Sequence, residues 1–150
     1  MIFRGAKAWS LPHTNEPEVL SNMVDFELSK PYRLTFSYHK DFLEARIVGL
    51  EDSFEISTAY WQEIAAEVRS GGFKKVLVIE KLAGDVDITS AYDIASLNAR
   101  TDFRNAKIAF VDEYKDHSES NRFSETVSNN RGRNIRVHNT IAEARDWLLK

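Results

Sequence analysis

Two short runs of uninterrupted apolar residues constrain the fold of this chain more than any other feature. Residues 76–79 are Val-Leu-Val-Ile, and residues 108–111 are Ile-Ala-Phe-Val. Runs of this kind, rich in β-branched side chains, are typical of strands that are covered on both faces. Such strands occur in parallel sheets with helices on either side. The two runs therefore predict an α/β fold with a parallel core.

The segment before these runs has a different strand pattern. Apolar and polar side chains alternate from Tyr32 to Tyr38 and again from Leu43 to Ile47, with three polar residues between them. A period of two indicates a strand with one face in water, and the short connection predicts an antiparallel hairpin. The predicted sheet is therefore mixed, with a hairpin first and parallel strands after it.

The segments between the predicted strands show the periodicity of helices. Tyr60, Ile64 and Val68 recur at the spacing of one helical face, with Ser57 as the expected N-cap and Gly71-Gly72 as the stop. Thr89 or Ser90 is expected to cap a second, short helix.

Two further helices are predicted towards the C-terminus. Asp116 and Glu119 have the spacing of a capping box that opens a third helix, which Gly132 ends, and a short strand follows at 135–137. Thr140 and Glu143 form a second capping box before the last helix, in which Trp147 is expected to be a core residue. The predicted order is β-β-α-β-α-β-α-β-α.

The 150 residues suggest one domain preceded by an extension. Residues 1–30 hold two of the three prolines and show no periodicity, so they are predicted to be an N-terminal extension that folding does not need, and residues 31–150 the domain. Met23 offers a second possible start of translation.

Composition excludes several classes of protein. The chain has no cysteine, which rules out disulfides and thiolate metal sites. A net charge of −3 argues against a nucleic-acid-binding protein. No apolar run approaches the ~20 residues of a membrane span, and no signal peptide is evident, so a cytoplasmic location is expected.

Motifs for catalysis are missing from the sequence. It has no phosphate-binding glycine loop and no nucleophile elbow, and its four histidines are scattered: His13, His39, His117 and His138. This pattern predicts no metal site, no cofactor and no enzymatic activity. The weak enzymatic alternative is the group Asp112, Glu113, Asp116 and His117.

Two segments remain as candidate binding sites. The loop Gly84–Ser90 follows a buried strand, where open α/β sheets meet their ligands and partners, and offers Asp85, Asp87, Thr89 and Ser90. The polar segment Ser118–Gly132 is predicted to form a hydrogen-bonded network, with an anion-binding face as the alternative. The residues of that face would be Asn121, Arg122 and Arg131.

Several stretches resemble one family. They are Glu55–Ser57, Ala59–Ala65, Ala109–Asp112, Asn121–Val127, Asn130–Gly132 and Ala144–Leu148. They are similar to the SpoIIAA-like proteins of the STAS superfamily, over about residues 30–150. The resemblance implies a mixed sheet flanked by helices. It also implies a regulatory module whose Ser or Thr at a helix start is phosphorylated, although the loop Asp85–Ser90 lacks the Asp-Ser-[Ser/Thr]-Gly motif of the anti-sigma-factor antagonists.

Two functions follow as hypotheses. The first is a non-enzymatic module that contacts a protein partner through the Gly84–Ser90 loop. The second is a carrier of a small apolar or lipid ligand between helix and sheet, as the resemblance implies for some members, with Trp61, Phe103 and Tyr92 as candidate lining residues. A second copy of the chain is a further candidate partner.

Overall fold

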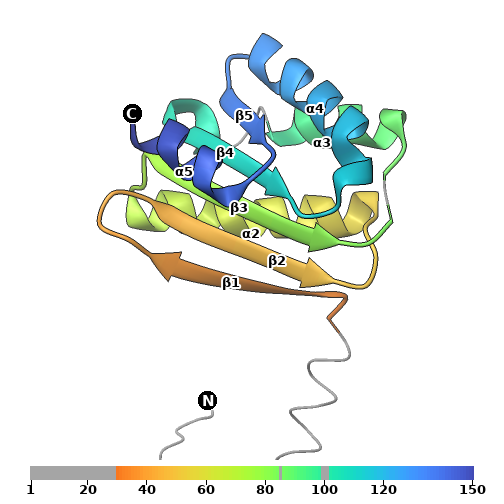
Figure 1. Ribbon diagram of the computed structural model, residues 1–150, viewed down its shortest axis with the longest axis horizontal. Helices are drawn as coiled ribbons and strands as arrows, with labels where there is room; N and C mark the ends of the chain where they lie inside the picture. Colours follow the sequence, from red (N-terminus) through yellow and green to blue (C-terminus); the bar gives the residue numbers. More distant parts are fainter. Residues whose placement is uncertain (1–29, 85, 99–101) are drawn as a thin grey trace, which may run out of the picture. The chain divides into compact units, whose positions relative to one another are not determined.

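The computed structural model describes residues 30–84, 86–98 and 102–150. Within this part of the chain, five strands form one sheet in the order β1-β2-β3-β4-β5 (Figure 1). Their bounds are β1 Tyr32–Tyr38, β2 Leu43–Gly49, β3 Lys75–Leu82, β4 Lys107–Asp112 and β5 Asn134–His138. The β1–β2 hairpin is antiparallel, and every other pair is parallel. The predicted mixed α/β fold and its element order are confirmed.

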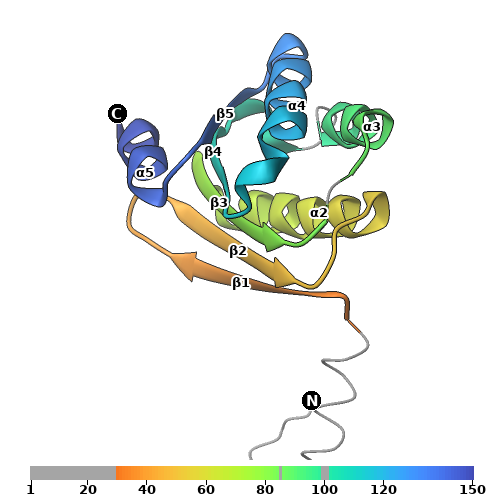
Figure 2. The ribbon, with the colours of Figure 1, turned by 45° about the vertical axis from the view of Figure 1, so that its right-hand side comes forward.

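The helices divide unequally between the two faces of the sheet. They are α2 Phe54–Gly71, α3 Ile88–Asn98, α4 Ser118–Asn130 and α5 Ile141–Leu149, with short 3₁₀ turns at Asp102–Asn105 and Lys115–His117. α5 lies alone on one side, and the other three lie on the opposite side (Figure 2). α3 packs mainly against α4 and α2 rather than on the sheet. The space between α3 and the strands is where the candidate site lies.

Successive side chains along each strand point to opposite faces of the sheet, so the fold has two hydrophobic cores. On the α2 side, Ala45, Ile47, Val76, Val78, Ile108 and Phe110 meet Tyr60, Trp61, Ile64 and Val68 of α2. On the α5 side, Leu77, Ile79, Ala109 and Val111 meet Ala144 and Leu148. The wholly apolar runs of β3 and β4 are therefore buried on both faces, as their sequences predict.

Three predicted helix starts are wrong. Ser53, not Ser57, caps α2, because its hydroxyl accepts a bond from the Ile56 N–H at 3.1 Å. Asp87 takes the cap position before α3, where its carboxylate accepts the Ser90 N–H at 2.9 Å. α4 begins after a 3₁₀ turn, and no side chain caps it. α2 and α3 each begin earlier than their most regular apolar residues suggest, and α4 begins irregularly, through the 3₁₀ turn.

Other helix ends agree with the sequence. Gly72 ends α2 in the left-handed conformation at φ 67°, and its N–H bonds the Val68 carbonyl. A side chain at this position would be strained, which explains the glycine. Thr140 caps α5 by accepting the Glu143 N–H at 3.1 Å.

Trp147 is half-buried and not the core residue that was predicted. Its ring is covered by cations, with Lys107 Nζ 4.5 Å and Arg136 5.6 Å from the ring centre. The Lys107 ammonium also donates to the Trp147 carbonyl at 2.7 Å. Cation–π contacts of this kind are typical of partly exposed rings.

We expect His138 to make the protein less stable in acid. Burial, followed by the charge of Arg136, lowers its pKa below the ordinary value of 6.5. A histidine with a lowered folded pKa is protonated more readily in the unfolded chain, so stability falls as the pH drops below about 6.5. Urea unfolding midpoints at pH 7.5 and pH 5 should differ more in the wild type than in His138→Gln. Equal differences would contradict this role.

The predicted N-terminal extension of residues 1–30 falls outside the described residues, except for Lys30, and stays a prediction. Among the helices that are described, none has the length and apolar character needed to cross a bilayer.

Candidate functional site

Acidic side chains gather where the parallel strands end. Glu80 of β3 and Asp112 of β4 are partners in register, and Asp52 lies in the loop after β2. Side chains two residues apart on a strand point to the same face of the sheet. Glu80 and Asp112 therefore face the α2 side, as Val78 and Phe110 do. The carboxyl edge of a parallel sheet is the usual place for a ligand site in this class of fold.

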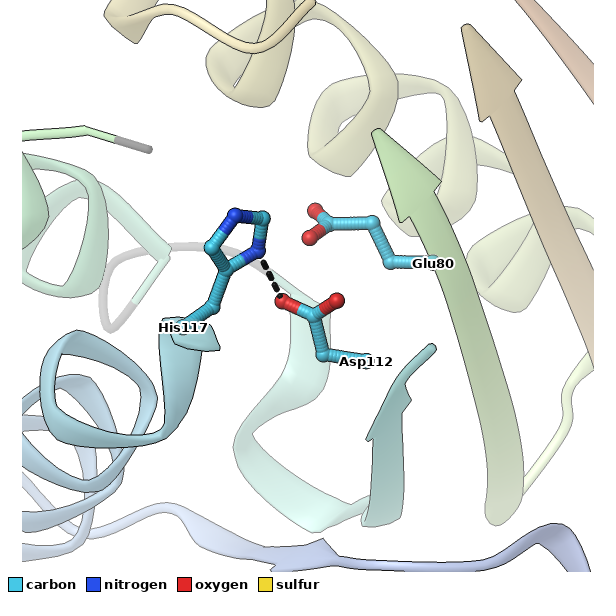
Figure 3. Close-up of side chains that lie close together, drawn as sticks. All are labelled: Glu80, Asp112 and His117. Atoms are coloured by element: carbon cyan, nitrogen blue, oxygen red, sulfur yellow. Dashed lines mark hydrogen bonds and ion pairs between the residues drawn. The ribbon is translucent and has the colours of Figure 1, made fainter. Parts of the chain in front are cut away.

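Asp112 is the centre of a buried hydrogen-bond network. Its Oδ2 is 2.8 Å from His117 Nδ1 and accepts the Asn121 side-chain amide at 2.9 Å. Its Oδ1 accepts the Tyr114 backbone N–H at 2.8 Å. His117 is 4% exposed and Asp112 is 6% exposed. Figure 3 shows the imidazole ring and the carboxyl groups of Asp112 and Glu80 turned towards one another.

A second network joins α2 to the same edge. The Tyr60 hydroxyl donates to the Glu80 carboxylate, and both side chains are buried. Burial raises the pKa of Glu80 well above its usual range, and the negative charge of Asp52 raises it further. Burial likewise raises the pKa of Asp52, although its Oδ1 accepts the Ser57 hydroxyl and the Ser53 N–H, each at 2.8 Å. The fold therefore holds three carboxyl groups close enough to repel one another as anions.

These groups form one wall of a partly open cavity of about 70 Å³. The polar part of its lining is Asp52, Ser57, Tyr60, Glu80, Asp112, His117, Asn121, Ser124, Glu125 and Ser128. The apolar part is Trp61, Val86, Ala91, Ile94, Ala95, Phe110, Ile135 and Val137. No lysine or arginine lines it among the described residues. A cavity of this kind is polar enough to hold water or a small ligand.

One subset of the wall could serve as a ligand set for a metal ion. Glu80, Asp112 and His117 each offer a donor atom, and these atoms lie within 4.8 Å of one another. The sequence predicted no metal-ligand set because the spacing of its histidines shows none. The three donors come from β3, β4 and the turn before α4, so the spacing of the histidines could not group them, and the predicted absence of a metal site stays a prediction.

The predicted partner loop lies partly at this edge. Asp85 is outside the described residues. Asp87 and Thr89 are exposed, and Ser90 is half-buried with its hydroxyl donating to Asp87 at 3.2 Å. None of these three lines the cavity. They form an exposed surface at the start of α3, so the partner assignment remains a proposal.

The three residues of the predicted anion-binding face do not come together. Asn121 points to Asp112 and lines the cavity. Arg131 lies ten residues further along, about 15 Å at the rise of a helix, and donates to the Tyr92 hydroxyl at 2.6 Å. Arg122 is exposed. The preferred prediction of a hydrogen-bonded network fits better, because Glu125 accepts the Val137 N–H at 2.6 Å and links α4 to β5.

Only one of the three predicted apolar lining residues borders the cavity. Trp61 does so, and it is 6% exposed. Phe103 packs edge-on against Trp61 with ring centres 5.5 Å apart, inside the core. Tyr92 is 43% exposed and faces Arg131 on the surface.

We expect the α3 cap to depend on Asp87. Hydrogen bonds from the Ser90 N–H and hydroxyl lower its pKa, so its contribution to stability is present above its usual pKa of 3.8 and is lost as pH falls through the lower folded value. Asp87→Ala should lower the thermal midpoint at pH 7, whereas Asp87→Asn should retain most of it, because asparagine caps equally well. Thr89→Ala is the matched control and should change nothing. A larger loss of thermal midpoint for Thr89→Ala than for Asp87→Ala would show that Thr89 is the cap.

Comparison with known proteins adds little beyond the fold. No protein-family model matches the sequence, and no curated protein is similar to it. A solved structure, an uncharacterised protein of the DUF3478 family from Shewanella loihica PV-4 described as having a SpoIIAA-like fold, is 14% identical. The match covers 78% of this chain and 93% of that one, with a TM-score of 0.48. Its description names the fold type that the sequence resembles, and says nothing of what this chain binds.

Proposed function

We propose that this chain is a non-enzymatic binding module that holds a small cationic ligand under α3 and contacts a protein partner through the outer face of that helix. The acidic cavity carries the proposal. Four acidic residues line it, Asp52, Glu80, Asp112 and Glu125, whereas His117, beside Asp112, is the one basic side chain there among the described residues, with no lysine or arginine. Glu80 and Asp112 are buried while Asp52 and Glu125 are half-buried, and a bound cation would offset the repulsion among carboxylates held this close together.

The two faces of α3 connect the cavity to the surface. Ala91, Ile94 and Ala95 line the cavity, while Thr89, Tyr92 and Asp93 are exposed on the other side. Because α3 packs mainly on helices rather than on the sheet, the contents of the cavity set how closely it can approach the strands. The helix is thus suited to report occupancy of the cavity to a partner.

Size disfavours the lipid alternative. The cavity, at about 70 Å³, has less than half the volume of an apolar cavity of roughly 150 Å³ that holds one benzene molecule. A space of this volume could not enclose a lipid chain. The polar wall also favours a ligand that carries charge.

The partner surface is tested by adding charge at Thr89. Tagged wild type, Thr89→Glu and Ser70→Glu would be used to recover partners from a lysate of the source organism. Ser70 is exposed near the end of α2, so it adds the same charge away from α3. We expect a partner that binds wild type and Ser70→Glu but not Thr89→Glu, because an added charge at an interface must be desolvated. Identical recovery by all three would remove α3 as the contact.

A further inference from the structure

The acidic end of the cavity has the donors of a metal centre. Glu80, Asp112 and His117 are 4%, 6% and 4% exposed, so water does not reach them freely. They are a mixed set, with two carboxylates and one imidazole, rather than a patch of surface acids. We infer that this cluster binds one divalent transition-metal ion of the zinc or manganese type. The inference rests on the proposed function and names its cation.

The separations suit a single ion. Metal–ligand bonds of about 2.0–2.2 Å allow two donors of one ion to lie at most about 4.4 Å apart. The three donor atoms lie within 4.8 Å of one another, so small side-chain rotations close the difference. Figure 3 shows the two carboxyl groups and the ring facing a common centre. The adjoining cavity leaves room for a water molecule as a further ligand.

The charge also balances. As metal ligands, the two carboxyl groups would bind as carboxylates and the imidazole without an added proton, and a divalent ion would cancel the resulting charge of −2. Asp52 keeps its own partners, the Ser57 hydroxyl and the Ser53 N–H. The bound ion would reduce the repulsion among the three carboxyl groups, a role that no lysine or arginine plays among the described residues that line the cavity.

Neighbouring side chains hold the proposed ligands in place. Tyr60 donates to Glu80, and Asn121 donates to Asp112 at 2.9 Å. Such outer partners orient metal ligands and are part of most protein metal sites. Imidazole suits zinc and other transition metals, whereas magnesium and calcium prefer oxygen ligands alone. The donor set therefore selects against the two common hard cations.

Calorimetric titration of the full chain, stripped with a chelator and dialysed, tests the inference. Zinc, manganese and magnesium chlorides would each be titrated into wild type, Glu80→Gln, His117→Gln and His39→Gln. His39 is the matched control, because its exposed ring lies 3.1 Å from Glu44 and represents an adventitious surface pair. We expect one zinc or manganese ion per chain at micromolar affinity or tighter, with magnesium at least tenfold weaker.

Glu80→Gln and His117→Gln should each weaken zinc binding at least tenfold, while His39→Gln leaves it unchanged. If His117→Gln does not fold, Glu80→Gln decides, together with the visible absorption of the cobalt(II) form, which changes when a ligand is lost. Absence of stoichiometric binding in wild type, or binding that both cavity variants retain, overturns the metal site. A different bound cation, with no response to zinc or manganese, overturns this inference but leaves the proposed function intact.

Discussion

Trp61→Ala should lower the free energy of unfolding by about 3–5 kcal/mol, as expected for a large buried aromatic side chain. Trp61 lies at the centre of the larger core, with ring centres 5.5 Å from Phe103 and 6.1 Å from Phe110. It also borders the cavity, so its removal would enlarge an existing space that the surrounding helices cannot easily close. Urea denaturation followed by circular dichroism gives the measurement.

Trp147→Ala is the matched control, because it removes the same side chain from a half-buried position. The loss there should be about 1–2 kcal/mol, since the stabilisation scales with the area removed from water. Equal losses for the two variants would contradict the burial difference on which the description of the core depends.

Asp112→Ala should also be strongly destabilising, by about 3–5 kcal/mol. It leaves three polar groups without their acceptor, namely the Tyr114 N–H, the Asn121 amide and the His117 ring nitrogen. Each buried polar group left unpaired costs about 1–3 kcal/mol, and removal of a carboxylate beside Glu80 offsets part of the sum.

Thermal and urea unfolding with a chelator present measure the effect of Asp112→Ala, so that no bound ion contributes. Asp112→Asn keeps an acceptor for the Tyr114 N–H and should lose less than the alanine variant. An unchanged midpoint for Asp112→Ala would show that the network around Asp112 does not hold the turn before α4.

The strands were predictable from sequence because their patterns are local. The apolar runs 76–79 and 108–111 and the alternation of 32–38 each identify one strand and the faces it buries. Helix starts were harder, because Ser53 and Asp87 cap helices whose regular apolar stripes begin later. The apolar pattern and helix propensity predict the central turns of a helix. The residue at which the helix begins depends on hydrogen bonds that several nearby polar residues could make.

The site was not predictable, because its residues come from separate elements. Asp112 and His117 were grouped from the sequence, but only as part of the weak enzymatic alternative. Glu80 directly follows the apolar run 76–79, and an acid inside a buried strand is the sequence signal that points to the site. Its register with Asp112 depends on the pairing of β3 with β4, and that pairing is a property of the sheet.

Native mass spectrometry of the intact protein, purified from its source organism without chelator, tests the central claim most directly. We predict a mass above that of the polypeptide for wild type and for His39→Gln, because the acidic cavity retains its cation. Glu80→Gln keeps the shape of the side chain but removes the carboxyl group that would bind the cation, so it should run at the mass of the polypeptide alone. A wild-type protein at the bare mass, or an excess mass that Glu80→Gln retains, would contradict the account.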